Sequence, residues 1–458
     1  MSAAVSRNTL IFSGGILLFL VFLLIGGGES TFYNALALGA LMIYFWVFEV
    51  IPIYVTALFP LVFAIPLGIL TKDDLAAAYG DNNVYLFFGG FLLALGLEKW
   101  KVHEQIAHGI ISVVGKSKSR ILFGFLMSTG FLSMWISNTA TALLMLPMAL
   151  GVIQSLPKEE QNSKFSLLLL LSVAFASSIG GVGTLIGSPP NTQMASILEK
   201  NYGITVDFFT WFKIGFPLAI TMLLCTFLFF YFSLGEERMD QRAHFHFPKK
   251  EWSKQQKTVA MIFATVIVLW ICKDFFSMLG ITYRDENVAL LGGLSLFLIP
   301  GDEKKKLLDW KDTEKLPWGI LLLFGGGLAL ASMLEKNGII EVISTLFERL
   351  NGVDYAVLLI TVIITAVFAS EVLSNLAMVS IFVPVIAGFA QLMDIPITQL
   401  AIPLTLGASL AFMLPVGTPP NAIVFSSGML HVNQMVRYGF VLNIIGIVLM
   451  FVFSMLIL

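Results

Sequence analysis

Long apolar runs separated by short polar segments make up most of this sequence. Many of these runs reach the roughly 18–20 residues that a helix needs to cross a hydrocarbon core of ~30 Å. A membrane barrel would instead show segments of about ten residues with alternating polarity. We therefore predict an all-α integral membrane protein with about 11 transmembrane helices. The expected spans are 10–27, 31–49, 53–70, 83–98, 165–199, 207–234, 257–278, 286–300, 318–334, 398–430 and 434–458.

Two further apolar stretches, 120–154 and 353–392, are too long for one span. A single helix over the first would be roughly 50 Å long, well beyond the ~30 Å core. Basic residues flank this stretch on both sides, with Lys118 before it and Lys164 after it. Both ends are therefore expected on the same side of the membrane. We predict two re-entrant hairpins, which turn near the pairs Ser137-Asn138 and Ser374-Asn375.

Composition and charge place the chain in the membrane and orient it. It is 57% hydrophobic and 12% charged, whereas soluble domains have about 25% charged residues. With a cytoplasmic N-terminus, 20 of the 27 Lys and Arg residues fall in cytoplasmic segments, as the positive-inside rule requires. We expect a multi-pass protein of the bacterial inner membrane with a retained first span and an external C-terminus. A formal net charge of −2 gives no sign of a nucleic-acid partner.

The sequence contains an internal repeat. Phe88-Gly89-Gly90 recurs as Phe324-Gly325-Gly326, Ser137-Asn138 as Ser374-Asn375, and Pro189-Pro190-Asn191 as Pro419-Pro420-Asn421. The spacing between copies is nearly constant, at 230 to 237 residues. An odd number of predicted spans separates the two hairpins, so the second copy should be inverted in the membrane. Inverted repeats with interrupted helices are typical of secondary transporters.

The hairpin tips have the chemistry of an anion and cation site. A re-entrant tip leaves backbone N–H and C=O groups unpaired at membrane depth. The N-terminus of a returning half-helix favours an anion, whereas carbonyl, Ser and Asn oxygens suit sodium. Each Pro-Pro pair should break its span, and the nearby Gly187 and Gly417 allow close approach of the backbone to an ion. One such motif alone would more often serve helix packing, but two copies in inverted order favour a binding site.

Glu371 precedes the second Ser-Asn pair and lies at predicted membrane depth. An acid in that position is a candidate functional group, either as a proton site or as a group that supports bound sodium. It could equally be a hydrogen-bonded group that holds the hairpin in place. The sequence leaves both interpretations open.

Together with Glu49-Val50-Ile51-Pro52 and Thr56-Ala57-Leu58-Phe59-Pro60, these motifs resemble the divalent anion/sodium symporter family over nearly the whole chain. That family includes bacterial and animal dicarboxylate and citrate transporters. The resemblance implies a homodimer with an elevator mechanism, in which a transport part moves against a scaffold part. The scaffold would comprise 1–104 and 257–350, the transport part 105–235 and 351–458, and a cytoplasmic loop 236–256.

The resemblance also implies roles for individual residues. The substrate-binding residues would be Ser137, Asn138, Thr139, Ser374, Asn375, Leu376, Thr418 and Pro419. One sodium ion would be bound by Ser133, Ser137, Asn138 and the Gly187 carbonyl, and a second by Ser370, Asn375 and the carbonyls of Leu373 and Gly417. Many members have threonine where this chain has Leu376, so one hydroxyl donor is missing at the second tip.

These observations predict a secondary transporter that imports C4-dicarboxylates such as succinate together with sodium ions. A sodium-independent dicarboxylate exchanger is an alternative, but it would need a cationic side chain near the tips, where the sequence has none. Proton coupling through Glu371 is a second alternative. An enzyme would need a nucleophile or metal cluster at membrane depth, and the sequence shows neither. A passive channel would produce single-channel currents, which we do not expect.

Overall fold

The computed structural model describes residues 7–114, 117–235, 251–302, 305–342 and 353–457. Within these ranges the protein is helical, and the one β contact is an isolated bridge between Pro300 and Lys306. Most of the predicted cytoplasmic loop 236–256 lies outside the described residues, as do Lys304 and Arg349. The prediction of an all-α protein is confirmed.

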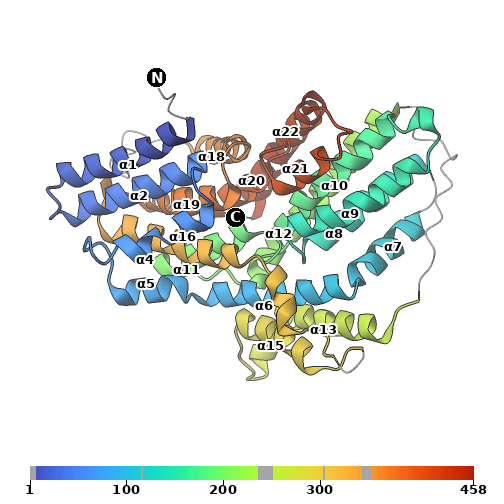
Figure 1. The fold of residues 1–458 in the computed structure, drawn as a ribbon, viewed down its shortest axis with the longest axis horizontal. Helices are drawn as coiled ribbons and strands as arrows, with labels where there is room; N and C mark the ends of the chain where they lie inside the picture. Colours follow the sequence, from blue (N-terminus) through green and yellow to red (C-terminus); the bar gives the residue numbers. More distant parts are fainter. Residues whose placement is uncertain (1–6, 115–116, 236–250, 303–304, 343–352, 458) are drawn as a thin grey trace, which may run out of the picture.

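The predicted spans correspond to helices along the whole chain (Figure 1). The unbroken ones are α1 (Arg7–Ile25), α2 (Thr31–Phe48), α6 (Asn82–Lys99), α12 (Phe208–Leu234), α13 (Lys254–Ile271), α15 (Asp285–Leu298), α16 (Trp318–Lys336) and α22 (Val432–Ile457). The span 53–70 divides into α3 (Ile53–Thr56) and α4 (Phe59–Phe63), because Pro60 starts a new helix in its first turn. Between spans lie α5 (Lys72–Tyr79) and α7 (Val102–Val114), whereas α14 (Lys273–Met278) continues the predicted span 257–278 after α13 ends.

Both hairpins form where the sequence predicts them. The first consists of α8 (Lys118–Ser133) and α9 (Asn138–Gln154), and the second of α18 (Tyr355–Ser370) and α19 (Asn375–Leu392). Each turns at its Ser-Asn pair.

Two spans are interrupted, also as predicted. The first comprises α10 (Lys164–Val182) and α11 (Pro189–Tyr202), and the second α20 (Thr398–Ala408) and α21 (Pro419–Phe425). The Pro-Pro pairs occupy the first turn of the second half-helix. This is the position where the missing N–H of proline costs nothing, so the prolines begin a helix rather than kink one.

The two repeats pack in equivalent ways and brace one another. Helix α8 lies along α10 in the first repeat, and α18 lies along α20 in the second. In addition, α21 packs against α9, and α11 packs against α19. The second half of each broken helix therefore supports the hairpin of the other repeat.

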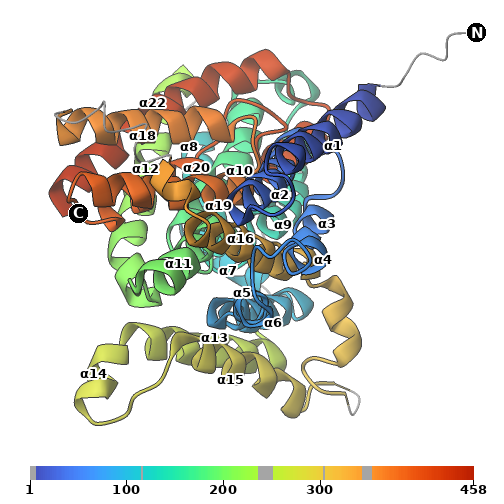
Figure 2. The ribbon, with the colours of Figure 1, turned by 90° about the vertical axis from the view of Figure 1, so that its left-hand side faces the viewer.

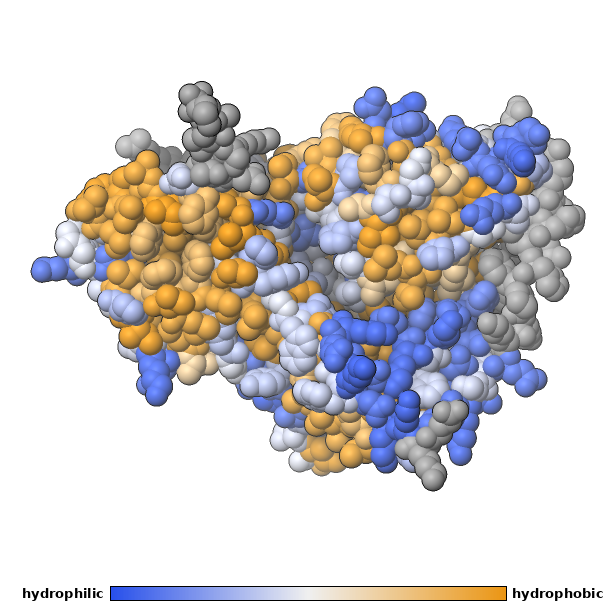
Figure 3. Space-filling model, in the orientation of Figure 1, coloured by the Kyte–Doolittle hydropathy of each residue, from blue (hydrophilic) through white to orange (hydrophobic). Residues whose placement is uncertain are grey.

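The remaining helices form a second group. Helix α6 lies along α15, and α16 packs against α2, α3, α4 and α5. The repeated glycines allow these contacts: a Cβ atom on Gly89 would lie 2.5 Å from the Ala289 carbonyl carbon, and one on Gly326 would lie 2.5 Å from the Ala57 oxygen. Helices α13, α14 and α15 lie together at one edge (Figure 2). A broad hydrophobic surface covers α1 and α2 (Figure 3), as expected for helices that face lipid.

Polar contacts join the two groups of helices. Glu199, near the end of α11, accepts from Arg284 (2.8 Å) and from Asn83 at the start of α6 (3.3 Å). Lys273 forms ion pairs of 3.1 Å with both Asp207 and Asp285. These contacts link α11 and α12 to α6, α14 and α15.

Candidate functional site

The first hairpin tip presents the N-terminus of α9. Ser137 caps this helix, and its hydroxyl accepts a hydrogen bond from the Ala140 backbone N–H (3.3 Å). Ser137, Asn138 and Thr139 are half-exposed, in contrast to the buried residues 132–136 that precede them. The first N–H groups of a helix have no partner within the helix. The tip therefore has accessible donors that could bind an anion, and the anion site stays a prediction.

Oxygen atoms converge beside this tip. The Ser133 hydroxyl donates to the Ser177 carbonyl (2.6 Å) and lies 2.7 Å from the Asn138 side-chain amide. With its nitrogen turned toward them, that amide donates to the Ser177 carbonyl (3.1 Å) and to the Gly187 carbonyl (3.3 Å). Gly181 makes room, since a Cβ atom there would lie 2.4 Å from Asn138 Oδ1.

Three of the residues predicted for the first sodium ion are thus brought together, namely Ser133, Asn138 and Gly187. Ser137, the fourth predicted residue, instead caps α9, and the Ser177 carbonyl, which was not predicted, lies in the cluster. Hard oxygen ligands of this kind, neutral and closely spaced, suit a small cation.

The asparagine of each Pro-Pro-Asn motif bridges a helix break. The Asn191 amide donates to the carbonyls of Gly181 and Thr184, each at 2.9 Å. The Asn421 amide donates in the same way to Ala411 (3.1 Å) and Leu414 (2.9 Å). Both asparagines are fully buried. Sequence reasoning recognised the motif but gave the asparagines no role; their repetition beside the prolines was the available signal.

The predicted ligand side chains of the second tip make fewer hydrogen bonds to neighbouring helices than those of the first tip. The Ser370 hydroxyl donates within its own helix to Val367 (2.8 Å). The Asn375 Oδ1 and Thr418 Oγ1 atoms are buried without a hydrogen-bond partner among the described residues. Ser370, Asn375 and Thr418 are therefore not connected to one another by hydrogen bonds in the part of the chain that is described.

Other predicted residues of the second tip differ in exposure. Leu373, Ser374 and Asn375 are half-exposed, and Pro419 is exposed. Leu376 is only 6% exposed, so its side chain is buried. Gly417 lies close to Glu371, since a Cβ atom on Gly417 would be 3.2 Å from Glu371 Oε2.

Glu371 binds the loop between α20 and α21. Its Oε1 accepts from the backbone N–H groups of Phe412 (2.8 Å) and Met413 (2.9 Å) and from the Asn443 side chain (2.8 Å). Its Oε2 accepts from Met413 (3.0 Å) and Leu414 (3.1 Å). Every partner is a donor, which suits a carboxylate because it only accepts.

These contacts favour a structural role for Glu371. The side chain is 4% exposed and ties the hairpin to the loop that contains Gly417. In the first repeat the equivalent contact runs from the Thr184 hydroxyl to the Met134 carbonyl. The repeats thus share the tip-to-loop connection but build it from different groups.

The fold is apolar and helical, with two hairpin tips, two broken helices and half-helix N-termini, and oxygen atoms cluster at the first tip. These features are those of a secondary transporter with inverted repeats. Comparison with known proteins agrees with this class. The chain belongs to the sodium:sulfate symporter family, because the profile of that family's transmembrane region matches residues 14–457. The resemblance drawn from the motifs is confirmed, and the protein is a transporter rather than an enzyme.

Related proteins match most of the chain. The sodium-dependent dicarboxylate transporter SdcS of Staphylococcus saprophyticus is 35% identical over 425 residues, covering 88% of this chain and 82% of that protein. The SdcS of Staphylococcus aureus is 34% identical over 432 residues, with the same coverage. The crystal structure of the Alcanivorax borkumensis YdaH transporter has a similar fold, with a TM-score of 0.57, 14% identity and coverage of 84% of this chain and 89% of that one.

Proposed function

We propose that this protein imports C4-dicarboxylates such as succinate, coupled to sodium. The observation that supports this most directly is the group of oxygen atoms around the Asn138 amide, contributed by Ser133, Ser177 and Gly187. The half-exposed N-terminus of α9 lies at the same tip, so an anion and a cation can bind side by side. The names of the SdcS relatives agree with both ligands.

Each carboxylate of the substrate binds one hairpin tip in this proposal. Ser137, Asn138 and Thr139 bind the first, Ser374 and Asn375 bind the second, and Thr418 and Pro419 line the same site. Leu376 contributes no hydroxyl, so the second carboxylate is held by fewer donors. The first sodium ion binds Ser133, Ser137, Asn138 and Gly187, and the second binds Ser370, Leu373, Asn375 and Gly417.

Sodium binds before substrate in this mechanism. In the first repeat the Asn138 amino group now contacts the oxygens of the cluster. A sodium ion takes its place as their partner, and this binding orders the tip. In the second, the unpaired Asn375 and Thr418 oxygens gain partners in the loaded state. Because the sequence around the tip motifs contains no lysine or arginine, the sodium ions compensate the charge of the dianion.

The packing supports a division into a part that moves and a scaffold. We propose that the hairpins, broken helices, α12 and α22 form the transport part (105–235 and 351–458), and that 1–104 and 257–350 form a dimerising scaffold. The transport part shifts across the membrane as a unit. The N-terminus is cytoplasmic and the C-terminus external in this proposal, on the charge distribution of the sequence.

Labelled-succinate uptake into proteoliposomes tests the function. An inward sodium gradient is compared with matched potassium and choline gradients, and we expect uptake with sodium alone. Asn138→Ala and Asn375→Ala should each abolish it, whereas Asn287→Ala, an exposed position on α15 outside the hairpins, should not. Intact uptake in both tip variants would refute the site.

The same vesicles distinguish the alternatives. Uptake without sodium, only into vesicles preloaded with dicarboxylate, would identify an exchanger and remove both sodium sites. Uptake driven by an inward proton gradient in the absence of sodium would identify proton coupling. Unitary currents across a planar bilayer would identify a channel.

A further inference from the structure

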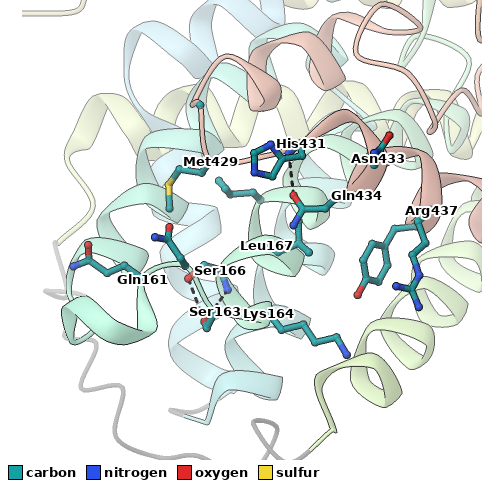
Figure 4. A pocket seen from close by; sticks show the side chains of 14 residues that line it. Gln161, Ser163, Lys164, Ser166, Leu167, Met429, His431, Asn433, Gln434 and Arg437 are labelled. Carbon is teal, nitrogen blue, oxygen red and sulfur yellow. Dashed lines mark hydrogen bonds between the residues drawn. The ribbon is translucent and has the colours of Figure 1, made fainter.

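A polar pocket lies away from the hairpin tips, between the start of α10 and the start of α22 (Figure 4). Its volume is about 800 Å³, and it is lined by the segment before α10, the first turns of α10 and the connection that leads into α22. None of the tip or loop residues proposed to bind substrate or sodium lines it. The pocket is therefore separate from the proposed transport site.

The charge of this pocket is positive. Lys164 and Arg437 line it together with His431, and no aspartate or glutamate is among the described residues that line it. Lys164 and Arg437 are both exposed and extend toward the same rim of the pocket (Figure 4). Neither forms an ion pair with any residue that the structure describes, whereas nearby Lys118 is paired with Glu160 at 2.8 Å.

Two long helices begin at the pocket. Lys164 is the first residue of α10, and α22 begins at Val432, directly after His431. The partial positive charge at each N-terminus adds to that of the two cations. Polar side chains that can donate hydrogen bonds, including Asn433 and Gln434, complete the upper lining. This combination suits a phosphate or another compact anion rather than a cation or a neutral ligand.

Part of the pocket lining is apolar. Leu167, Leu170 and Met429 contribute to it, and Tyr438 adds an aromatic ring. Both α10 and α22 are long and apolar enough to cross a membrane, and the first turns of spanning helices are expected near the lipid headgroups. Charged and apolar groups in one pocket match an anionic phospholipid, which carries its phosphodiester next to its acyl chains.

We propose that this pocket binds a phosphate-bearing anion through Lys164 and Arg437, and that the headgroup of an anionic phospholipid is its source. On the orientation expected from the basic loops, this is the cytoplasmic leaflet. A lipid held here contacts the starts of α10 and α22, two helices of the proposed transport part. The proposal depends on this pocket alone, and it is independent of whether succinate is the transported substrate.

Calorimetric titration of the full-length protein in detergent tests the proposal with three probes: dihexanoyl-phosphatidylglycerol, dihexanoyl-phosphatidylcholine and inorganic phosphate. We expect phosphatidylglycerol to bind at least ~10-fold more tightly than phosphatidylcholine, and this preference to weaken as salt is raised. The double variant Lys164→Ala/Arg437→Ala should lose the preference. Its thermal unfolding should match the wild type, because both side chains are exposed and make no described ion pair.

A matched control removes the same charges elsewhere. Lys72 is the first residue of α5 and Arg120 is exposed on α8, so Lys72→Ala/Arg120→Ala should retain the preference for phosphatidylglycerol. Equal binding of the two lipids by the wild type, or an unchanged preference in the Lys164/Arg437 variant, would overturn the proposal. Inorganic phosphate that binds as tightly as phosphatidylglycerol and displaces it would keep the phosphate site but overturn the lipid as its source.

Discussion

Replacing Glu371 by glutamine gives a quantitative test of the second hairpin. The carboxylate accepts from the N–H groups of Phe412, Met413 and Leu414 and from the side chain of Asn443. Glutamine retains one oxygen. If that oxygen replaces Oε1, the new amino group faces the Leu414 N–H, which is left without an acceptor.

The cost of this change follows from the hydrogen bonds that it breaks or weakens. An N–H group left without its partner inside the protein costs about 1–3 kcal/mol. The remaining bonds are no longer charge-assisted, and charge assistance makes such bonds roughly twice as strong as neutral ones. A neutral side chain is easier to bury than a charged one, which offsets part of the cost. We expect Glu371→Gln to destabilise the protein by about 2–4 kcal/mol.

Two measurements on one set of variants test the destabilisation expected for Glu371→Gln. The apparent Tm in detergent, followed by tryptophan fluorescence, should fall for Glu371→Gln, and sodium-driven succinate uptake should fall at every pH between about 5 and 8. Asn443→Leu is the matched control, because it removes one charge-assisted bond and leaves the carboxylate bound to the backbone; it should cost about 1.5–3 kcal/mol, less than Glu371→Gln, and leave the pH dependence of uptake unchanged. An unchanged apparent Tm together with uptake that no longer depends on pH would refute this reasoning and make Glu371 a titrating group in transport.

Three further predictions follow from individual contacts. Gly181→Ala places a Cβ atom 2.4 Å from Asn138 Oδ1, so it should abolish sodium stimulation of uptake while the purified protein remains folded by thermal unfolding; normal sodium stimulation would contradict the proposed site. Asn191→Ala leaves two backbone carbonyls without their donor, and we expect a loss of about 1–3 kcal/mol, seen as a lower apparent Tm. At Asp74, burial alone would raise the pKa, but hydrogen bonds from the Lys336 ammonium and the Thr71 backbone outweigh it and lower the pKa to about 2. Because the folded pKa is below the unfolded value, the stabilisation is complete above about pH 4 and is lost toward pH 2; the difference in apparent Tm between wild type and Asp74→Asn, worth up to ~1 kcal/mol, should disappear over that range, and a difference that persists at the lower end would exclude this ion pair as its cause.

The hairpins were predictable because the thickness of the bilayer limits the length of one span, and the broken helices because each contains a Pro-Pro pair. Stretches 120–154 and 353–392 exceed that length and turn at a polar pair, so their shape follows from counting residues. The division of 53–70 into α3 and α4 was not predicted. Its hydropathy is that of an ordinary span, and the effect of Pro60 depends on where a helix begins around it.

The parts of the candidate site that could not be predicted from the sequence are mostly backbone atoms. The Ser177 carbonyl joins the oxygen cluster because α10 passes beside the first tip, and no side-chain pattern reports that contact. Glu371 was recognised as unusual, but its role depended on the N–H groups of a loop distant in sequence. The roles of Asn191 and Asn421 could have been suspected, since both recur beside the same prolines.

The mutual bracing of the repeats has a consequence for how the protein is made. Helix α9 follows the first tip at Asn138, but its partner α21 begins only at Pro419. At translation rates of about 5–20 residues per second, α21 leaves the ribosome tens of seconds after the first hairpin. During that interval the hairpin lies in the membrane with one side uncovered. The protein therefore completes the packing around its first hairpin as one of the last steps of its biogenesis, and a chain truncated before α21 lacks this contact.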